Sequence, residues 1–250
     1  MTKNNIIAVF TSKNTEKQLN LLKKNQNFIH AIEVRVDTFY KNDFSIETIS
    51  HIIKKIQDFL PKTKIIITFR QFNEGGYIKV SDNTRFYVIS KILEESFKNI
   101  DYIDIEFYSK IRNKVINLAK KYNKSLILSY HKLKRTNDNE KILKIIKQIV
   151  KFAKNSVKCK NFIKIVIKCD KYDYFLEILK NVYKTSKKID IFKKMTIFSI
   201  GKTSLLTRLT SIILDMPLVY GAISTAVIQT QPNIDKLISI KKDLGLIYNK

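Results

Sequence analysis

The stretch Phe162-Ile163-Lys164-Ile165-Val166-Ile167 is an apolar run interrupted by one charged side chain. A short continuous apolar run is typical of a strand that is buried on both faces, as in a parallel sheet. A buried charged amine is costly unless it is paired, neutralised or used. Burial can free a lysine lone pair for imine formation, which makes Lys164 a candidate nucleophile. The alternative is a lysine that reaches back to water from the strand end.

Similar segments recur along the chain, which contains 250 residues, of which 44% are hydrophobic. The expected strands are residues 6–10, 31–36, 64–69, 102–107, 125–130, 162–167, 195–200 and 218–223. Amphipathic stretches with helical spacing lie between or after them, at residues 45–59, 83–97, 110–122, 137–152, 172–186, 204–214 and 234–244. The expected N-cap residues are Asn14, Ser45, Asp82 and Asn233.

This alternation predicts the fold class: α/β, with one (β/α)8 TIM-barrel domain over residues 1–250. A doubly wound open sheet is the alternative, but the Gly-rich first turn that usually accompanies it is absent from the sequence. No stretch rich in proline, glycine and serine marks a linker between two domains.

Strand parity locates the chemistry, because alternate side chains of a barrel strand point inward and outward. The apolar set should face the helices. The ionisable residues on the opposite, inward parity are Glu33, Arg35, Asp37, Arg70, Asp104, Glu106 and Lys164. Since an ordinary barrel interior is mostly Val, Ile and Leu, these charges predict a polar pocket at the carboxyl ends of the strands, where active sites of this fold lie.

Two further features lie at strand ends. His131 follows the fifth expected strand and could transfer protons near neutral pH, although a loop or capping histidine is an equal alternative. Gly75 and Gly76 follow Arg70 in a chain that has only five glycines. We expect glycine to remain mainly where the backbone requires it, so this loop is either functional or a tight structural turn.

The bulk composition excludes several classes of function. The formal net charge of +25 would favour nucleic-acid binding, but the lysines are spread along the whole chain, and we expect no specific nucleic-acid partner. No stretch approaches the roughly 18 apolar residues of a membrane helix. The two cysteines lack metal-site spacing, which fits a cytoplasmic protein. Gly201-Lys202-Thr203-Ser204 resembles the end of a P-loop, but Thr196 stands where that motif needs glycine.

Read in order, these motifs resemble the type I 3-dehydroquinate dehydratases along nearly the whole chain. Glu33-Val34-Arg35-Val36-Asp37 is similar to the family's E-x-R-x-D strand, and Thr68-Phe69-Arg70 with Glu74-Gly75-Gly76 is similar to its T-F-R…E-G-G. The remaining matches are Ser129-Tyr130-His131, Ile163-Lys164-Ile165, Ser199-Ile200-Gly201-Lys202 with Arg208, and Tyr220-Gly221-Ala222 with Gln231.

The resemblance implies dehydration of 3-dehydroquinate to 3-dehydroshikimate, a step of the shikimate route to aromatic amino acids, without a metal or other cofactor. Lys164 would form the Schiff base, His131 would shuttle protons and Glu74 would assist it. The residues implied to bind substrate are Glu33, Arg35, Arg70, Arg208 and Gln231. We also expect Arg35, Arg70 and Arg208 to repel the charged form of the lysine. The family implies a homodimer.

One segment departs from the family. Its closing loop usually reads close to S-A-P-G-Q, whereas this chain has Val227-Ile228-Gln229-Thr230-Gln231. Val227 cannot donate the hydrogen bond of the serine, a loss of about 0.5–1.5 kcal/mol, or up to about 3 for a charged partner. Two alternatives follow: a catalytically impaired barrel that binds a ligand or partner, and another Schiff-base lyase or aldolase of the same fold.

Overall fold

The chain is described by a computed structural model that covers residues 5–134, 139–156, 161–186, 193–223 and 230–246. Its strands are β1 (Ile6–Phe10), β2 (Ile29–Arg35), β3 (Lys64–Thr68), β4 (Tyr102–Glu106), β5 (Ser125–Lys132), β6 (Asn161–Lys168), β7 (Met195–Ile200) and β8 (Val219–Ala222). Its α-helices are α1 (Thr15–Asn25), α2 (Val36–Lys41), α3 (Ile46–Phe59), α4 (Asp82–Ser96), α5 (Arg112–Lys121), α6 (Asn139–Ser156), α7 (Tyr172–Ser186), α8 (Ser204–Ile213) and α9 (Ile234–Asp243).

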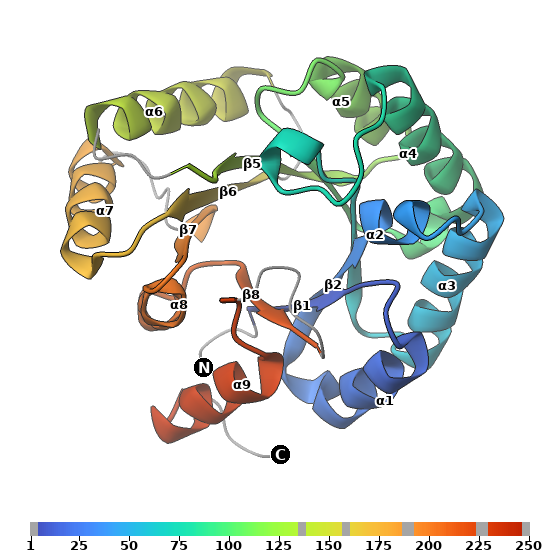
Figure 1. Cartoon of the computed structure of the whole chain (residues 1–250), viewed down its shortest axis with the longest axis horizontal. Helices are drawn as coiled ribbons and strands as arrows, with labels where there is room; N and C mark the ends of the chain where they lie inside the picture. Colours follow the sequence, from blue (N-terminus) through green and yellow to red (C-terminus); the bar gives the residue numbers. More distant parts are fainter. Residues whose placement is uncertain (1–4, 135–138, 157–160, 187–192, 224–229, 247–250) are drawn as a thin grey trace.

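The strands form one parallel sheet in the order β7-β6-β5-β4-β3-β2-β1-β8. The sheet curls into a nearly closed barrel, and the helices surround it (Figure 1). This arrangement confirms the predicted TIM barrel. Within the described residues, no ladder of backbone hydrogen bonds connects β7 to β8. A side chain connects this part of the sheet instead, because Thr196 Oγ1 on β7 accepts a hydrogen bond from the backbone N–H of Leu218 at 2.9 Å.

The apolar core has two layers, as strand parity predicts. The larger layer lies between the strands and the helices and includes Ile32, Val34 and Ile165. The smaller layer fills the inside of the barrel with apolar side chains from every strand, such as Ile7, Ile66 and Val166. On β2, β3 and β4 the charged residues follow these inward positions toward the carboxyl ends of the strands, whereas on β6 Lys164 precedes Val166. Apolar side chains of the inner layer therefore lie beneath and beside a polar site.

The sequence prediction needed correction at helix starts. Ser45 and Asn233 are N-caps, accepting from the backbone N–H of Thr48 and of Lys236 respectively. Asp82 is the first helical residue of α4, and Ser81 caps that helix. Asn14 occupies the cap position of α1 without a capping hydrogen bond from its side chain.

Two helices lie outside the predicted helix ranges, although Asn14 was the expected N-cap of the first. Helix α1 has a weak apolar stripe because polar Gln18 and Asn25 share its buried face with leucines. Helix α2 begins at Val36, directly after β2, so Val36 and Asp37 are helical rather than the end of a strand. Tertiary partners explain the change, because the carboxylate of Asp37 accepts hydrogen bonds from Arg35 and from the backbone N–H groups of Arg70 and Tyr77.

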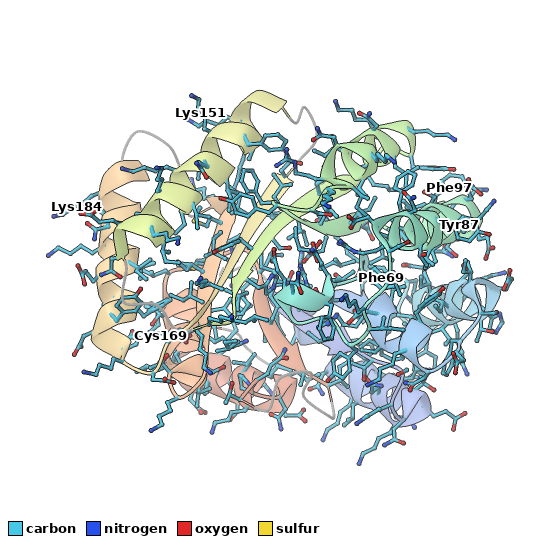
Figure 2. All side chains as sticks on the ribbon, turned by 45° about the horizontal axis from the view of Figure 1, so that its top comes forward. Phe69, Tyr87, Phe97, Lys151, Cys169 and Lys184 are labelled. Atoms are coloured by element: carbon cyan, nitrogen blue, oxygen red, sulfur yellow. The ribbon has the colours of Figure 1, made fainter. Side chains whose placement is uncertain are left out.

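The surface is rich in lysine on many sides of the molecule. Figure 2 shows Lys151 and Lys184 projecting away from the barrel, whereas Phe69 lies inside the fold. The part of the chain that the structure describes contains no helix both long and apolar enough to cross a membrane.

Candidate active site

A pocket opens inside the barrel. It brings together all eight residues that the sequence singled out: Glu33, Arg35, Arg70, Glu74, His131, Lys164, Arg208 and Gln231. The rest of its wall comes from Val9, Gly75, Val166, Phe198 and Tyr220. These residues derive from strands and loops spread over most of the chain, so barrel closure is what assembles the site.

Lys164 occupies the middle of β6 and is only 4% exposed. Its Nζ lies 3.0 Å from Glu33 Oε1 and 2.9 Å from Asp104 Oδ2, and 4.0 Å from the centre of the Tyr220 ring. The lysine therefore does not reach back to water; it forms two buried ion pairs. Removing one partner of such a pair is strongly destabilising because the other charge is left uncompensated.

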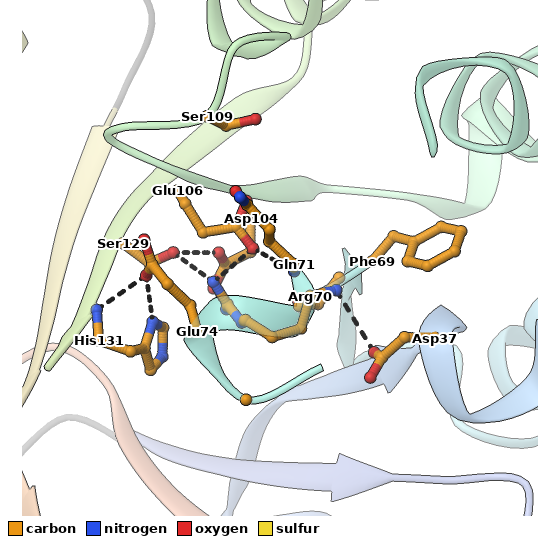
Figure 3. A network of polar contacts seen from close by, with 12 residues as sticks. Asp37, Phe69, Arg70, Gln71, Glu74, Asp104, Glu106, Ser109, Ser129 and His131 are labelled. Atoms are coloured by element: carbon orange, nitrogen blue, oxygen red, sulfur yellow. Dashed lines mark hydrogen bonds and ion pairs between the residues drawn. The ribbon is translucent and has the colours of Figure 1, made fainter. Parts of the chain in front are cut away.

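Figure 3 shows a network of polar contacts around Arg70, and its member Asp104 also contacts the lysine. Arg70 Nη2 lies 2.8 Å from Asp104 Oδ2, the oxygen that also contacts Lys164, and Arg70 Nη1 contacts Glu106. Ser129 accepts from Arg70 and donates to Asp104 at 2.6 Å. Burial alone would raise the pKa of Asp104, but Arg70 and Lys164 lower it to about 2. Asp104 is therefore ionised throughout the physiological range.

The arginines are less repulsive toward Lys164 than we expected. Arg70 shares the carboxylate of Asp104 with the lysine, and Arg35 is paired with Asp37 at 2.8 Å. Burial alone would lower the pKa of Arg70, but the negative charges of Asp104 and Glu106 raise it above its ordinary value. Because carboxylates accompany these two arginines, the positive charge around the amine is largely balanced.

Glu74 and His131 form a pair at the pocket wall. Glu74 Oε2 accepts from the backbone N–H of His131 at 2.8 Å and lies 3.1 Å from Nδ1 of its ring. Burial, reinforced by Glu106, raises the pKa of Glu74 to about 8. Burial, reinforced by Arg70 and Lys164, lowers the pKa of His131 well below its ordinary value. At neutral pH the contact is therefore a hydrogen bond between uncharged partners, which together hold a proton that can be exchanged.

The two glycines after Glu74 hold this pair in place. Gly75 has the left-handed φ of 93° that favours glycine, and its carbonyl accepts from Arg35 at 3.3 Å. A Cβ on Gly76 would lie 2.1 Å from the backbone oxygen of Arg70. The loop is thus a tight turn, and it places Glu74 against His131.

Arg208 on α8 is a buried cation without a carboxylate partner among the described residues. Its Nε donates to the carbonyl of Tyr220 at 2.8 Å, and its Nη1 donates to the carbonyls of Ser199 and Ser204, both at 3.0 Å. Burial lowers the pKa of Arg208 to about 9, so the side chain stays charged at neutral pH. A guanidinium that lines a pocket and has no carboxylate partner among the described residues is suited to bind an anionic ligand.

Sequence reasoning missed Arg85, whose guanidinium pairs with Glu106 beside Arg70. The helical period could have indicated that Arg85 is buried, because it lies three residues before Val88 on the apolar stripe of α4. Asp104 and Glu106 were placed inside the barrel but given no role. Of the departing loop, residues 227–229 lie outside the described residues; Thr230 accepts from the backbone N–H of Gly201 at 3.1 Å.

Within the described residues, no cluster of three or more His, Cys, Asp or Glu side chains is arranged to hold a metal ion. A buried lysine, a hydrogen-bonded Glu–His pair and an arginine that has no carboxylate partner among the described residues face one pocket. Together with the fold, they define the class: a (β/α)8 lyase that works through a lysine imine.

The comparisons identify the family within that class. The model of the family described as "Type I 3-dehydroquinase" matches residues 6–246, and the chain belongs to this family of Schiff-base enzymes of the shikimate pathway. A 3-dehydroquinate dehydratase of Hydrogenobaculum is 26% identical over 213 residues, which cover 84% of this chain and 87% of the relative. That of Pyrococcus abyssi is 40% identical over 73 residues, or 29% of this chain and 33% of the relative.

A solved structure shows the same fold. The type I 3-dehydroquinate dehydratase of Clostridium difficile has a TM-score of 0.80 with this chain at 20% identity, covering 98% of this chain and 93% of that one.

Proposed function

We propose that this chain dehydrates 3-dehydroquinate to 3-dehydroshikimate, with Lys164 as the imine-forming nucleophile. The observation that carries the proposal is the common pocket of Lys164, the Glu74–His131 pair and Arg208. Lys164 would react with a ketone, the Glu74–His131 pair would exchange a proton, and Arg208 would bind a carboxylate. 3-Dehydroquinate has all three of these groups.

His131 carries the protons of the reaction. Lys164 loses one proton to His131, and its amine attacks the C3 ketone. His131 passes this proton, and then a second one from the same nitrogen, to the ketone oxygen, which departs as water and leaves a protonated imine. The imine draws electrons toward nitrogen, so His131 can then remove the C2 proton. His131 gives that proton to the C1 hydroxyl, which leaves as the second water, and hydrolysis of the imine releases the product.

Glu74 supports the histidine by exchanging a proton at Nδ1. Because its pKa of about 8 lies close to neutral pH, the carboxyl can gain or lose a proton at little cost. Asp104 and Glu33 would stabilise the protonated imine, since they already contact Nζ.

Substrate binding would use the cations of the pocket. Arg208 would hold the carboxylate with a planar fork of donors. Arg35, Arg70 and Gln231 would bind substrate oxygens, together with Glu33. Arg35 and Arg70 are already paired to carboxylates, so they are suited to neutral hydroxyls, whereas Arg208 is suited to the anion.

Borohydride trapping tests the proposal. Reduction in the presence of 3-dehydroquinate should leave a covalent adduct on the peptide that contains Lys164, as read by mass spectrometry. Lys164→Arg keeps a cation against Glu33 and Asp104 but removes the primary amine, so it should fold and yield neither adduct nor product. Lys168→Ala, at the exposed end of the same strand, should leave both unchanged. Absence of any adduct in the unaltered protein would refute the mechanism.

An impaired barrel that only binds ligand is the competing function, because Val227 replaces the family's serine. Appearance of dehydroshikimate by ultraviolet absorbance separates the two. An adduct without product would indicate that binding and imine formation survive but elimination does not.

We further propose a single catalytic domain over residues 1–250, working in the cytoplasm as a homodimer. Exposed apolar side chains on α7 and α8 support an interface between copies: Leu176, Tyr183, Leu206 and Ile213 are each at least 40% exposed. Sedimentation would measure the oligomeric state.

A further inference from the structure

Tyr220 on β8 carries a buried hydroxyl that the mechanism above does not use. The side chain is 2% exposed and lines the pocket beside Lys164. Its Oη has no hydrogen-bond partner among the residues that the structure describes. Buried polar atoms without partners are rare because they cost free energy, and each one therefore calls for an explanation in the function of the site.

The ring is held in a fixed position against the lysine. Tyr220 pairs with Ile7 in the β1–β8 register and packs against the ring of Phe198, with centroids 5.8 Å apart. Next to it, a Cβ on Gly221 would lie 2.8 Å from Leu237 of α9, so the glycine allows α9 to pack closely behind the strand. Lys164 Nζ lies 4.0 Å from the centre of the Tyr220 ring. Any carbon bonded to Nζ must therefore lie close to this ring.

We propose that the Tyr220 hydroxyl donates a hydrogen bond to the oxygen on the substrate carbon that Lys164 attacks, an inference that rests on the proposed function. This oxygen gains negative charge as the C–N bond forms. It then receives two protons that come from the lysine amine through His131, and it leaves as water when the C–O bond breaks. Tyr220 keeps its own proton throughout, so it stabilises the developing charge without taking part in the proton balance.

The surroundings of Tyr220 suit a donor. Burial, reinforced by the carboxylates of Glu33 and Asp104, raises the pKa of Tyr220 well above its ordinary value. The phenol therefore remains protonated across the working pH range. Lys164 and Arg70 already occupy those carboxylates, which leaves the Tyr220 hydroxyl available for a ligand.

The test is Tyr220→Phe, which removes one oxygen and keeps the ring. The rate of borohydride-trapped adduct formation should fall roughly three- to tenfold, with a similar loss in kcat and little change in KM. Because the unpartnered hydroxyl is also gone, Tm of the empty protein should rise by about 1–3 °C. Tyr87→Phe makes the same chemical change at a side chain that is 56% exposed on α4, and it should change none of these values.

The outcomes separate the two proposals. If the unaltered protein forms the adduct and Tyr220→Phe forms it at the same rate and kcat, the role assigned to the hydroxyl is overturned, whatever Tm does. If Tyr220→Phe lowers both Tm and activity, the hydroxyl has a structural role instead, and the inference also fails. If the unaltered protein forms no adduct, the imine mechanism itself fails, and this inference fails with it.

Discussion

The raised pKa of Glu74 makes a quantitative prediction about stability. A carboxyl with a pKa of about 8 in the folded protein and 4.5 in the unfolded chain binds more protons when folded. The contribution of this group to stability is therefore fully present below pH 4.5 and is lost as pH rises toward 8. Glu74→Gln replaces it by an uncharged group of similar shape. The free energy of unfolding of this variant relative to the unaltered protein should grow by about 3 kcal/mol between pH 5.5 and pH 8.5.

Urea unfolding followed by circular dichroism at several pH values measures this difference directly. His131 has a lowered pKa and contributes stability that is lost as pH falls below about 6.5, but this change is common to both proteins and largely cancels. Activity should move the other way: kcat of Glu74→Gln should drop about tenfold or more, because an amide cannot exchange a proton with the imidazole. A stability difference that stays flat across this pH range would refute the protonated state assigned to Glu74.

Two other substitutions test the anion site and the turn. Arg208→Lys keeps the charge but loses the planar fork, so KM should rise about ten- to a hundredfold with a smaller change in kcat, measured by steady-state kinetics; an unchanged KM would place the substrate carboxylate elsewhere. Gly76→Ala should lower the free energy of unfolding by about 1–3 kcal/mol and reduce kcat/KM, because its Cβ would meet the Arg70 carbonyl at 2.1 Å. Normal stability and activity in that variant would mean that the turn relaxes without moving Glu74.

The inward positions could be predicted from the sequence because a strand has a strict two-residue period. That period alone places Glu33 and Lys164 in the interior. The pairings could not be predicted in the same way, since Lys164 contacts Glu33 across 131 residues of chain. Arg85 could have been found by extending the helical period of α4 to a charged residue. The unpartnered hydroxyl of Tyr220 could not be predicted from the sequence, because it depends on where all the neighbouring side chains lie.

Arg208 joins the β7 carbonyl of Ser199 to the β8 carbonyl of Tyr220, at the join where the described backbone forms no ladder. The side chain that we propose for the substrate carboxylate therefore also links these two strands. Selection for an intact barrel alone would preserve it, even in a descendant that had ceased to turn over substrate. The presence of this arginine is therefore poor evidence of an active enzyme in distant relatives.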